Sequence, residues 1–546
     1  MALAEEILAA LDPDQRAVAL ATRGPVCVIA GAGTGKTRAI THRIAYAVAI
    51  GTMDPTKVLA LTFTAKAAGE MRTRLRALGV PTVAARTIHA AALKQLLYFW
   101  PTVFGGRTPD LITTKTGFLT EAINRAGLAD SLRASNRELM RDLASEIEWA
   151  KVSQVAPTDY IAEVSARQQK PRVNPEQMVQ IYTAYESIKK EELAIDFEDV
   201  LLLCAAMLEQ EPDVRERVHD QYRYFTIDEY QDISPVQQRL INAWLGNRKE
   251  ICVVGDPAQT IYSFAGATPT FLNSFTQRFP EAEVIRLTTG YRSTPEIIFA
   301  ANALLRHGQM GQELVAHNGH GSKPIVSSYQ DESAEVAGIL DEISTLLSDG
   351  TPPQEIAILA RTNSQLATAE KALRHANLPY QVRNTEKFFE RKEIRDFLAQ
   401  VRKASVIPSD GWIDELRTLA QPYLTGDAID GIAALLHLAR ELDGDPTFEP
   451  KTLRTYLREV EDRVQQNNPP TMPVLTLATL HAAKGLEWER VFLMGASDGQ
   501  LPLAGSDPEE ERRLFYVGIT RAKADLHISY QRTPSPFLRE SGLIPA

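Results

Sequence analysis

A short apolar segment that runs into a glycine-rich turn constrains the fold of this chain more than any other feature. Val26–Ala30 is followed by Gly-Ala-Gly-Thr-Gly-Lys-Thr at residues 31–37 and then by a stretch compatible with a helix. Glycines let backbone N–H groups turn inward around phosphates, and the N-terminus of the following helix adds positive potential. Lys36 would reach the β- and γ-phosphates, and Thr37 would coordinate Mg²⁺. The first motif position is Ala30 rather than Gly, and the alternative is a plain glycine-rich turn. The order of strand, loop and helix favours the phosphate site.

A second apolar segment ends in carboxylates. Tyr224–Ile227 is followed by Asp228-Glu229-Tyr230-Gln231-Asp232. Ligands bind at the carboxyl edge of parallel sheets, so Asp228 could hold Mg²⁺ while Glu229 activates water. Alone, an acidic strand end is more often a turn or a helix cap. Together with the phosphate loop it predicts a nucleotide site.

The order of segments predicts an α/β fold with two parallel sheets, each interrupted by helices. Apolar strands alternate with helical patterns early in the chain, and a second alternating region begins near Val284. Segments with mostly helical patterns interrupt the strands from about Ala90 to Leu208 and again from Phe397 to Pro473. Within the second of these segments, Asn467–Pro470 marks a linker. The predicted organisation is a first α/β domain at 1–89 and 209–278 with an insertion at 90–208, and a second at 279–396 and 474–546 with an insertion at 397–473.

Composition sets the broad class of protein. A chain of 546 residues with 44% hydrophobic and 23% charged residues has the apolar content of a folded multidomain protein. It has no run of about 18 apolar residues and no basic leader, so we expect a cytoplasmic protein without a membrane partner. Cys27, Cys204 and Cys252 are far apart, which predicts reduced thiols and no iron–sulfur cluster. The net charge of −10 disfavours a protein covered in basic surface, but nucleic acid can still bind if Lys and Arg line one channel, so composition leaves the partner undecided.

The phosphate loop and the Asp-Glu-x-Gln-Asp segment together resemble UvrD/Rep-like superfamily 1A DNA helicases. Further stretches follow in that family's motif order, and the resemblance covers about residues 11–530. They are Leu11–Gln15 (adenine-reading motif), Leu61–Ala68 (motif Ia), Thr87–His89 (Ib), Val253–Ala267 (III), Tyr291–Thr294 (IV), Leu480–Glu487 (V) and Tyr516–Ala522 (VI). The resemblance implies two RecA-like motor domains that bind ATP and Mg²⁺.

The resemblance also assigns roles at the nucleotide. Gln15 would hydrogen-bond adenine, and Arg38 and Tyr291 would stack on it. Glu487 would meet the ribose, and Gln259 would sense the γ-phosphate. Either Arg292 or Arg521 alone would more often be a surface ion pair, but in this family they neutralise transition-state charge. The implied nucleotide-binding set is Gln15, Ala30, Gly31, Ala32, Gly33, Thr34, Gly35, Lys36, Thr37, Arg38, Tyr291 and Glu487, with Lys36, Glu229, Gln259, Arg292 and Arg521 catalytic and Thr37 and Asp228 on the metal.

Aromatic residues in motifs Ia and III are the implied contacts to single-stranded DNA. Ring stacking holds bases without reading their sequence, and Phe63, Tyr262 and Phe264 occupy the family's positions. Lone aromatics are more often core residues, and lone histidines often have structural hydrogen bonds. The remaining expected contacts, directed at the DNA backbone, are Thr64, His89, Arg361 and His481.

The leading interpretation is an ATP-dependent 3′-to-5′ DNA helicase that acts on single strands and ss/ds junctions, with DNA-repair proteins as possible partners. A translocase that displaces proteins with little unwinding is the close alternative. It is favoured by Ala265, where the family has Arg, and by the short second insertion. An RNA motor remains open, because stacking does not read the 2′-hydroxyl. A non-catalytic nucleotide-binding protein is disfavoured by the intact set of catalytic residues. Because the chain ends at Ala546, we expect no C-terminal interaction module.

Overall fold

The computed structural model describes most residues of the chain, and they form two compact units. The described residues are 2–112, 114–132, 137–167, 171, 173–383, 388–405, 411–424, 429–444, 450–465, 470, 472 and 474–545. The first unit contains most residues up to Thr288, and the second contains most residues from Thr289 onward. Within the described ranges, no helix combines the length and the apolar character needed to cross a membrane.

The first unit is built on a six-stranded parallel sheet with the order β3-β2-β6-β7-β1-β8. Its strands are β1 (Val26–Ala30), β2 (Val58–Thr62), β3 (Ala84–Thr87), β6 (Tyr224–Ile227), β7 (Ile251–Gly255) and β8 (Glu283–Leu287). Successive strand residues point to opposite faces, so Val26 and Val28 pack into one apolar cluster and Cys27 packs into the other. Both faces are therefore buried, as in doubly covered α/β sheets.

Helices cover both faces of this sheet. Those packed in the cluster with Val26 include α2 (Pro13–Leu20), α3 (Lys36–Ala49) and α4 (Ala65–Ala77), and α1 (Ala2–Ala9) contacts α3. Helices of the opposite face are α5 (Ile88–Val103), α10 (Phe197–Gln210), α11 (Pro212–Gln221), α12 (Pro235–Leu245), α13 (Thr270–Asn273) and α14 (Phe275–Arg278). Short 3-10 turns complete the unit: η1 (Pro55–Lys57), η2 (Tyr230–Asp232), η3 (Pro257–Gln259) and η4 (Ser263–Ala265).

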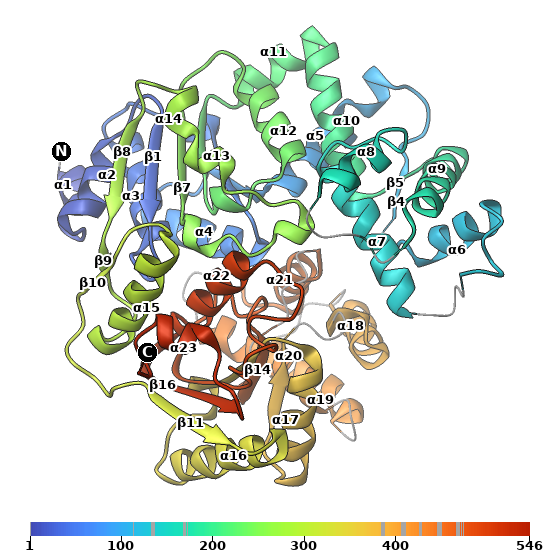
Figure 1. The fold of residues 1–546 in the computed structure, drawn as a ribbon. Helices are drawn as coiled ribbons and strands as arrows, with labels where there is room; N and C mark the ends of the chain where they lie inside the picture. The colour runs from blue at the N-terminus through green and yellow to red at the C-terminus, as the bar shows by residue number, and fades with distance from the viewer. Residues whose placement is uncertain are drawn as a thin grey trace. The chain divides into compact units, whose positions relative to one another are not determined.

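The predicted boundary at 278/279 is wrong, because β8 belongs to the first sheet. Its residues pair in parallel with β1 over Val26↔Glu283 to Ala30↔Leu287 (Figure 1). The alternating pattern near Val284 correctly indicates a strand. The order of apolar and helical segments shows where a strand lies, but it does not show which sheet that strand joins.

A separate helical cluster forms the first insertion. It consists of α6 (Thr116–Arg125), α7 (Arg137–Val152), α8 (Tyr160–Ala166) and α9 (Pro175–Glu191), with a short parallel pair between β4 (Asp110–Leu111) and β5 (Ala194–Ile195) at its base. The predicted limits at 90 and 208 fall inside α5 and α10. Both helices pack on the sheet, so the independent cluster is smaller than predicted.

The second unit also contains a six-stranded parallel sheet, which confirms the predicted pair of parallel α/β domains. Its order is β11-β16-β15-β12-β14-β13. The strands are β11 (Ile325–Tyr329), β12 (Ile356–Ala360), β13 (Tyr380–Val382), β14 (Leu475–Thr479), β15 (Trp488–Leu493) and β16 (Ala522–Gln531). Further elements are β9 (Thr289–Gly290), β10 (Val315–Ala316), α15 (Pro295–Gly308), α16 (Glu332–Ser348), η5 (Pro353–Glu355), α17 (Asn363–His375), α22 (Pro508–Ile519) and α23 (Pro536–Glu540).

The second insertion has its own apolar core. Its elements are η6 (Phe388–Glu390), α18 (Lys392–Ala404), α19 (Trp412–Ala420), η7 (Gln421–Tyr423), α20 (Ile429–Gly444) and α21 (Leu453–Gln465). Phe389 and Ile394 are buried in this core, so the insertion begins before the predicted limit at 397, which falls inside α18. Most of the predicted Asn467–Pro470 linker lies outside the described residues.

Candidate nucleotide and DNA site

The phosphate loop has the strand, turn and helix that the sequence predicts. Ala30 ends β1, and α3 begins at Lys36. Gly33 and Gly35 have φ angles of 72° and 77°, in the left-handed region that favours glycine. A β-carbon on Gly35 would lie 2.5 Å from the Nε2 atom of Gln15, so glycine also permits this close approach. Gly31, Ala32 and Thr34 complete the loop.

The carboxylates after β6 face the start of α3. Lys36 Nζ lies 3.4 Å from Glu229 Oε1, and Thr37 Oγ1 donates to Asp228 Oδ2 at 3.5 Å. Burial lowers the pKa of Lys36, but nearby carboxylates, Glu229 foremost, outweigh it and hold the pKa above its ordinary value. Burial, followed by the charge of Glu229, raises the pKa of Asp228 to about 7.

This donor set fits a Mg²⁺ ion. Hydroxyl and carboxylate oxygens are the ligands that this hard cation prefers, and Thr37 and Asp228 bring one of each together. Asp228 and Glu229 place two carboxylates beside the phosphate loop, and a divalent cation would offset their negative charge. The residues present therefore fit the predicted metal position.

Hydrogen bonds connect Glu229 to the next motif. Gln231 Nε2 donates to Glu229 Oε2, and Gln231 Oε1 accepts from the backbone N–H of Asp256 at 3.0 Å. Asp256 Oδ2 in turn accepts from Gln259 Nε2 at 2.7 Å. These four side chains, which we term the Gln231 relay, join the predicted base to the predicted phosphate sensor. Gln231, Asp256 and Gln259 are buried.

Arg38 and Gln15 lie on the same unit as the phosphate loop. Besides its contact with Gly35, Gln15 has its backbone N–H bound to Asp12 Oδ1 at 2.7 Å, which caps α2. Arg38 donates a hydrogen bond to the carbonyl of Ala10. The structure thus brings together Gln15, Lys36, Thr37, Asp228, Glu229 and Gln259.

The other predicted nucleotide residues form a group in the second unit. Arg292 Nε donates to Glu487 Oε2 at 2.6 Å, and its Nη1 donates to the carbonyl of Thr520 at 3.2 Å. Burial raises the pKa of Glu487, but Arg292 and Lys523 outweigh it, and the net pKa lies below the ordinary value. Arg521 is buried and donates to the Val517 and Leu486 carbonyls.

Tyr291 lies beside His317 in the second unit, with the ring centroids 4.6 Å apart. It precedes Arg292 at the end of the short β9 segment.

Three predicted DNA-binding rings form one stack in the first unit. Phe63 and Tyr262 are stacked with centroids 5.6 Å apart and an interplanar angle of 16°. Tyr262 meets Phe264 edge-on at 6.1 Å. Phe63 and Phe264 are 38% and 48% exposed, so these rings offer faces to a ligand instead of filling the core. Thr64 directly follows Phe63, between β2 and α4.

The predicted DNA-binding residues His89, His481 and Arg361 do not form a row of unpaired positive charges. Burial lowers the pKa of His89 to about 4, and burial with Arg361 and Lys484 lowers that of His481 to about 4. Both imidazoles are therefore neutral near pH 7 and can contact DNA only as uncharged groups. Arg361 is bound by both oxygens of buried Glu511, at distances down to 2.7 Å.

Phe197 is a ring that the sequence analysis missed. It is the first residue of α10, is 43% exposed, and meets His89 edge-on at 6.3 Å. Gln231 and Lys523 were also missed, although Gln231 stands inside the quoted acidic motif. For Phe197 the only local signal is an aromatic residue directly after the capping Asp196.

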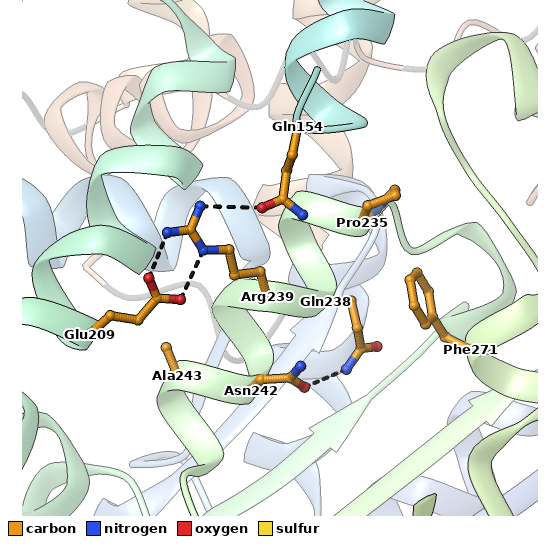
Figure 2. Close-up of a pocket in the computed structure, with 8 residues that line it drawn as sticks. All are labelled: Gln154, Glu209, Pro235, Gln238, Arg239, Asn242, Ala243 and Phe271. Atoms are coloured by element: carbon orange, nitrogen blue, oxygen red, sulfur yellow. Dashed lines mark hydrogen bonds and ion pairs between the residues drawn. The ribbon is translucent and has the colours of Figure 1, made fainter. Parts of the chain in front are cut away.

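A hollow of about 480 Å³ lies apart from these residues. Arg239 of α12 forms two bonds with Glu209 of α10, at 2.8 and 2.5 Å, and one with Gln154 at 3.2 Å (Figure 2). Gln238 in its lining accepts a hydrogen bond from the Tyr230 hydroxyl at 2.6 Å. None of the predicted site residues lines this hollow.

The phosphate loop, the acidic strand end and the two parallel sheets define a P-loop nucleotide hydrolase. A family model described as the UvrD/REP helicase N-terminal domain matches residues 11–280, and one described as the UvrD-like helicase C-terminal domain matches residues 285–405 and 413–533. The chain belongs to the UvrD/Rep helicase family of superfamily 1.

Named relatives agree with this family. The chain is 43% identical over 570 residues to ATP-dependent DNA helicase UvrD2 of Mycobacterium tuberculosis (strain ATCC 25618 / H37Rv), covering 98% of this chain and 81% of that protein. It is 30% identical over 630 residues to ATP-dependent DNA helicase PcrA of Leuconostoc citreum, covering 95% and 83%. For PcrA of Bacillus subtilis (strain 168) the identity is 28% over 640 residues, covering 98% and 85%.

Proposed function

We propose that this ATP-dependent DNA helicase moves 3′ to 5′ on single-stranded DNA and unwinds ss/ds junctions. The observation that carries the proposal is the Gln231 relay, because it joins the residues beside the phosphate loop to the segment that bears the stacked rings. Gln259 ends the relay and lies three residues before Tyr262. The proposed setting is DNA repair or replication in the cytoplasm, with DNA-repair proteins as partners.

Each residue near the phosphate loop has a role in the proposed hydrolysis. Lys36 binds the β- and γ-phosphates, and Glu229 accepts a proton from the attacking water. Thr37 and Asp228 would hold Mg²⁺, which neutralises phosphate charge when bound. Gln231 keeps the Glu229 carboxylate oriented through its short hydrogen bond. Arg292 and Arg521 are proposed to neutralise charge on the transferred phosphoryl group.

The proposed coupling acts through the relay. A change in the contacts of Gln259 would alter Asp256 and Gln231, and the same change would shift the η3 turn that leads to Tyr262 and Phe264. ATP state and ring position would then change together. Because stacking contributes about 1–3 kcal/mol per base, a small shift of the rings is enough to release or hold a base.

The test is ATP hydrolysis with and without single-stranded DNA, for the wild type and Glu229→Gln. Loss of a positioned general base lowers the rate by roughly 10²–10⁴-fold. Glu216→Gln removes the same charge from the exposed face of α11 and is the matched control. DNA stimulation that disappears only in Glu229→Gln supports the proposal. Activity that survives this substitution would refute the assigned base.

A translocase with little unwinding is the second candidate. Ala265 follows Phe264 at the position where the family carries Arg, and the second insertion is a small helical cluster. The PcrA alignment runs over 640 positions, more than the length of this chain, so that relative has residues within the aligned region that this chain lacks.

Three substrates separate these candidates and test the direction of movement. A duplex with a 3′ tail should be unwound faster than one with a 5′ tail if the helicase proposal is right. Displacement of streptavidin from a biotinylated strand, without unwinding of either duplex, would favour the translocase. Preference for the 5′ tail would contradict the proposed polarity.

A further inference from the structure

A buried ion cluster lies where two helices of the first insertion, α7 and α9, meet the start of the sheet-packed α10. Lys151 Nζ of α7 lies 2.8 Å from both carboxylate oxygens of Asp196 and 2.5 Å from Asp199 Oδ1. Lys189 Nζ of α9 lies 2.8 Å from Asp196 and 2.5 Å from Asp199. Glu186 contacts both lysines, at 3.1 and 2.9 Å. We term these five residues the Lys151 cluster.

The cluster is satisfied internally and is not a metal centre. Its three carboxylates offer oxygens within 4.8 Å of one another, but the two ammonium groups already bind all three. Burial lowers the pKa of Lys151, yet Asp196, Asp199 and Glu186 hold it well above its ordinary value. Lys151, Lys189 and Asp196 are almost completely buried, so the charges are shielded from water and their geometry is rigid.

On one side, the cluster fixes the start of α10. Asp196 is the N-cap of this helix and accepts from the backbone N–H of Asp199 at 2.9 Å, while Asp199 accepts from that of Asp196 at 3.1 Å. The next residue after the cap is the exposed ring of Phe197. Its place beside His89 therefore depends on the same carboxylates that bind Lys151.

On the other side, the cluster adjoins the stacked rings. Val152 follows Lys151 at the end of α7, and its Cγ2 atom would lie 2.5 Å from a β-carbon on Gly266. Gly266 ends the η4 turn that contains Phe264. The end of α7 is therefore packed tightly against the ring-bearing turn, one residue from the cluster.

A weaker contact joins the same helices at the surface. Arg239 binds Glu209 in the last turn of α10 and Gln154 just after α7 (Figure 2). The Arg239 and Glu209 side chains are 34% and 40% exposed, so solvent screens this pair. The Lys151 cluster is the buried one of these two links between α7 and α10.

We infer that the Lys151 cluster is a positioning device for single-stranded DNA, which sets the spacing between the Phe197 ring and the Phe264 ring. The inference rests on the proposed function, because it requires that both rings stack on bases. A ring that stacks on a base loses affinity when it is displaced by even a fraction of its width. A rigid buried cluster between α7 and α10 would hold the Phe197 and Phe264 rings at a fixed spacing.

The experiment measures affinity for a fluorescent oligo(dT) strand by anisotropy, together with the DNA dependence of ATP hydrolysis. Phe197→Ala should weaken binding by roughly 5- to 150-fold, the loss expected for one stacked base. Lys151→Met should weaken it by roughly fivefold and raise the DNA concentration for half-maximal stimulation, while the rate at saturating DNA is kept. In the double variant the losses should not add, because Lys151 acts through Phe197.

Arg167→Met is the matched control. Arg167 binds both oxygens of Glu146 at 3.1 Å and lies over the Trp149 ring, so both of these partners belong to α7 within the same helical insertion. An equal loss of DNA affinity in Arg167→Met, or additive losses in the Lys151→Met/Phe197→Ala pair, would overturn the positioning role. If Lys151→Met does not fold, Asp199→Asn keeps the side-chain size, and the same outcomes apply to it.

Failure of the underlying function has a different signature. If Phe197→Ala and Phe264→Ala both bind oligo(dT) as tightly as the wild type, the ring-stacking proposal itself is wrong. If those two variants bind weakly while Lys151→Met and Asp199→Asn bind normally, only the positioning inference fails.

Discussion

Gln231 connects two motifs that are separated along the chain. Its amide nitrogen binds Glu229, two residues away, and its amide oxygen binds the N–H of Asp256, at a sequence separation of 25. Lys36, Thr37, Asp228 and Glu229 could be predicted from the sequence because each stands at a strand end or loop with its own local pattern. A bond between β6 and β7 segments depends on strand order, which no local pattern encodes.

Gln231→Ala should uncouple hydrolysis from DNA. Leaving buried partners unsatisfied costs about 1–3 kcal/mol, so we expect DNA stimulation of ATP hydrolysis to fall by roughly tenfold. The measurement is the ratio of rates with and without oligo(dT), with Gln277→Ala on the exposed face of α14 as control. An unchanged ratio in Gln231→Ala would show that the relay does not transmit the signal.

His89 should make the protein sensitive to acid. Its pKa is about 4 in the folded protein, below its ordinary value of 6.5, so its contribution to stability is present above pH 6.5 and is lost as pH falls toward 4. Replacing it by Asn should reduce the loss of unfolding free energy between pH 7.5 and pH 5 by roughly 2 kcal/mol. Urea unfolding at both pH values measures this, with exposed His375→Asn as control. Equal pH dependence in His89→Asn and the wild type would contradict it.

At the scale of elements, strands were predicted well and their partners were not. The expected strands at Val26–Ala30 and Tyr224–Ile227 appear as β1 and β6. β8 was assigned to the wrong sheet, because the order of apolar and helical segments identifies a strand but not its neighbour. The limits of both insertions were also displaced, since α5 and α10 continue helical patterns while packing on the sheet.

Gly266 offers a sharp test of the contact between η4 and α7. Its φ is 81°, and an added β-carbon would collide with Val152, whereas Gly79 has the same φ and nothing within 4 Å. Both Gly→Ala variants should incur backbone strain of about 1 kcal/mol, but Gly266→Ala should lose roughly 1–3 kcal/mol more. Thermal unfolding measures the difference.

The second substitution Val152→Ala should relieve the collision in Gly266→Ala and restore much of the lost stability. Equal destabilisation of the Gly79 and Gly266 variants would mean that α7 adjusts without cost. In that case the tight contact would not hold the ring-bearing turn.

At the scale of the whole molecule, an acidic chain has to bind a polyanion. The net charge is −10, both candidate histidines are neutral near pH 7, and Arg361 is paired with Glu511. The binding free energy should therefore come mainly from rings. We expect the slope of log Kd against log[NaCl] for oligo(dT) to be small, about 1 to 2.

Phe264→Ala is the informative comparison, because it should weaken binding at every salt concentration without changing that slope. Fluorescence anisotropy between 50 and 200 mM NaCl measures both the Kd and its salt slope. Over this range of salt, the affinity of a protein that binds mainly through phosphates falls by roughly 10³-fold or more. A slope above about 4 would show that phosphate contacts, not stacking, dominate.

The way the second insertion joins the sheet allows its length to change during evolution. It departs after β13 and returns at β14, two strands that already pair side by side, and its apolar core is separate from that of the sheet. Closing a longer excursion between fixed ends costs only about 0.6 kcal/mol for each doubling of length. The second insertion can therefore change in length or be replaced during evolution while the parallel sheet of the second unit stays the same.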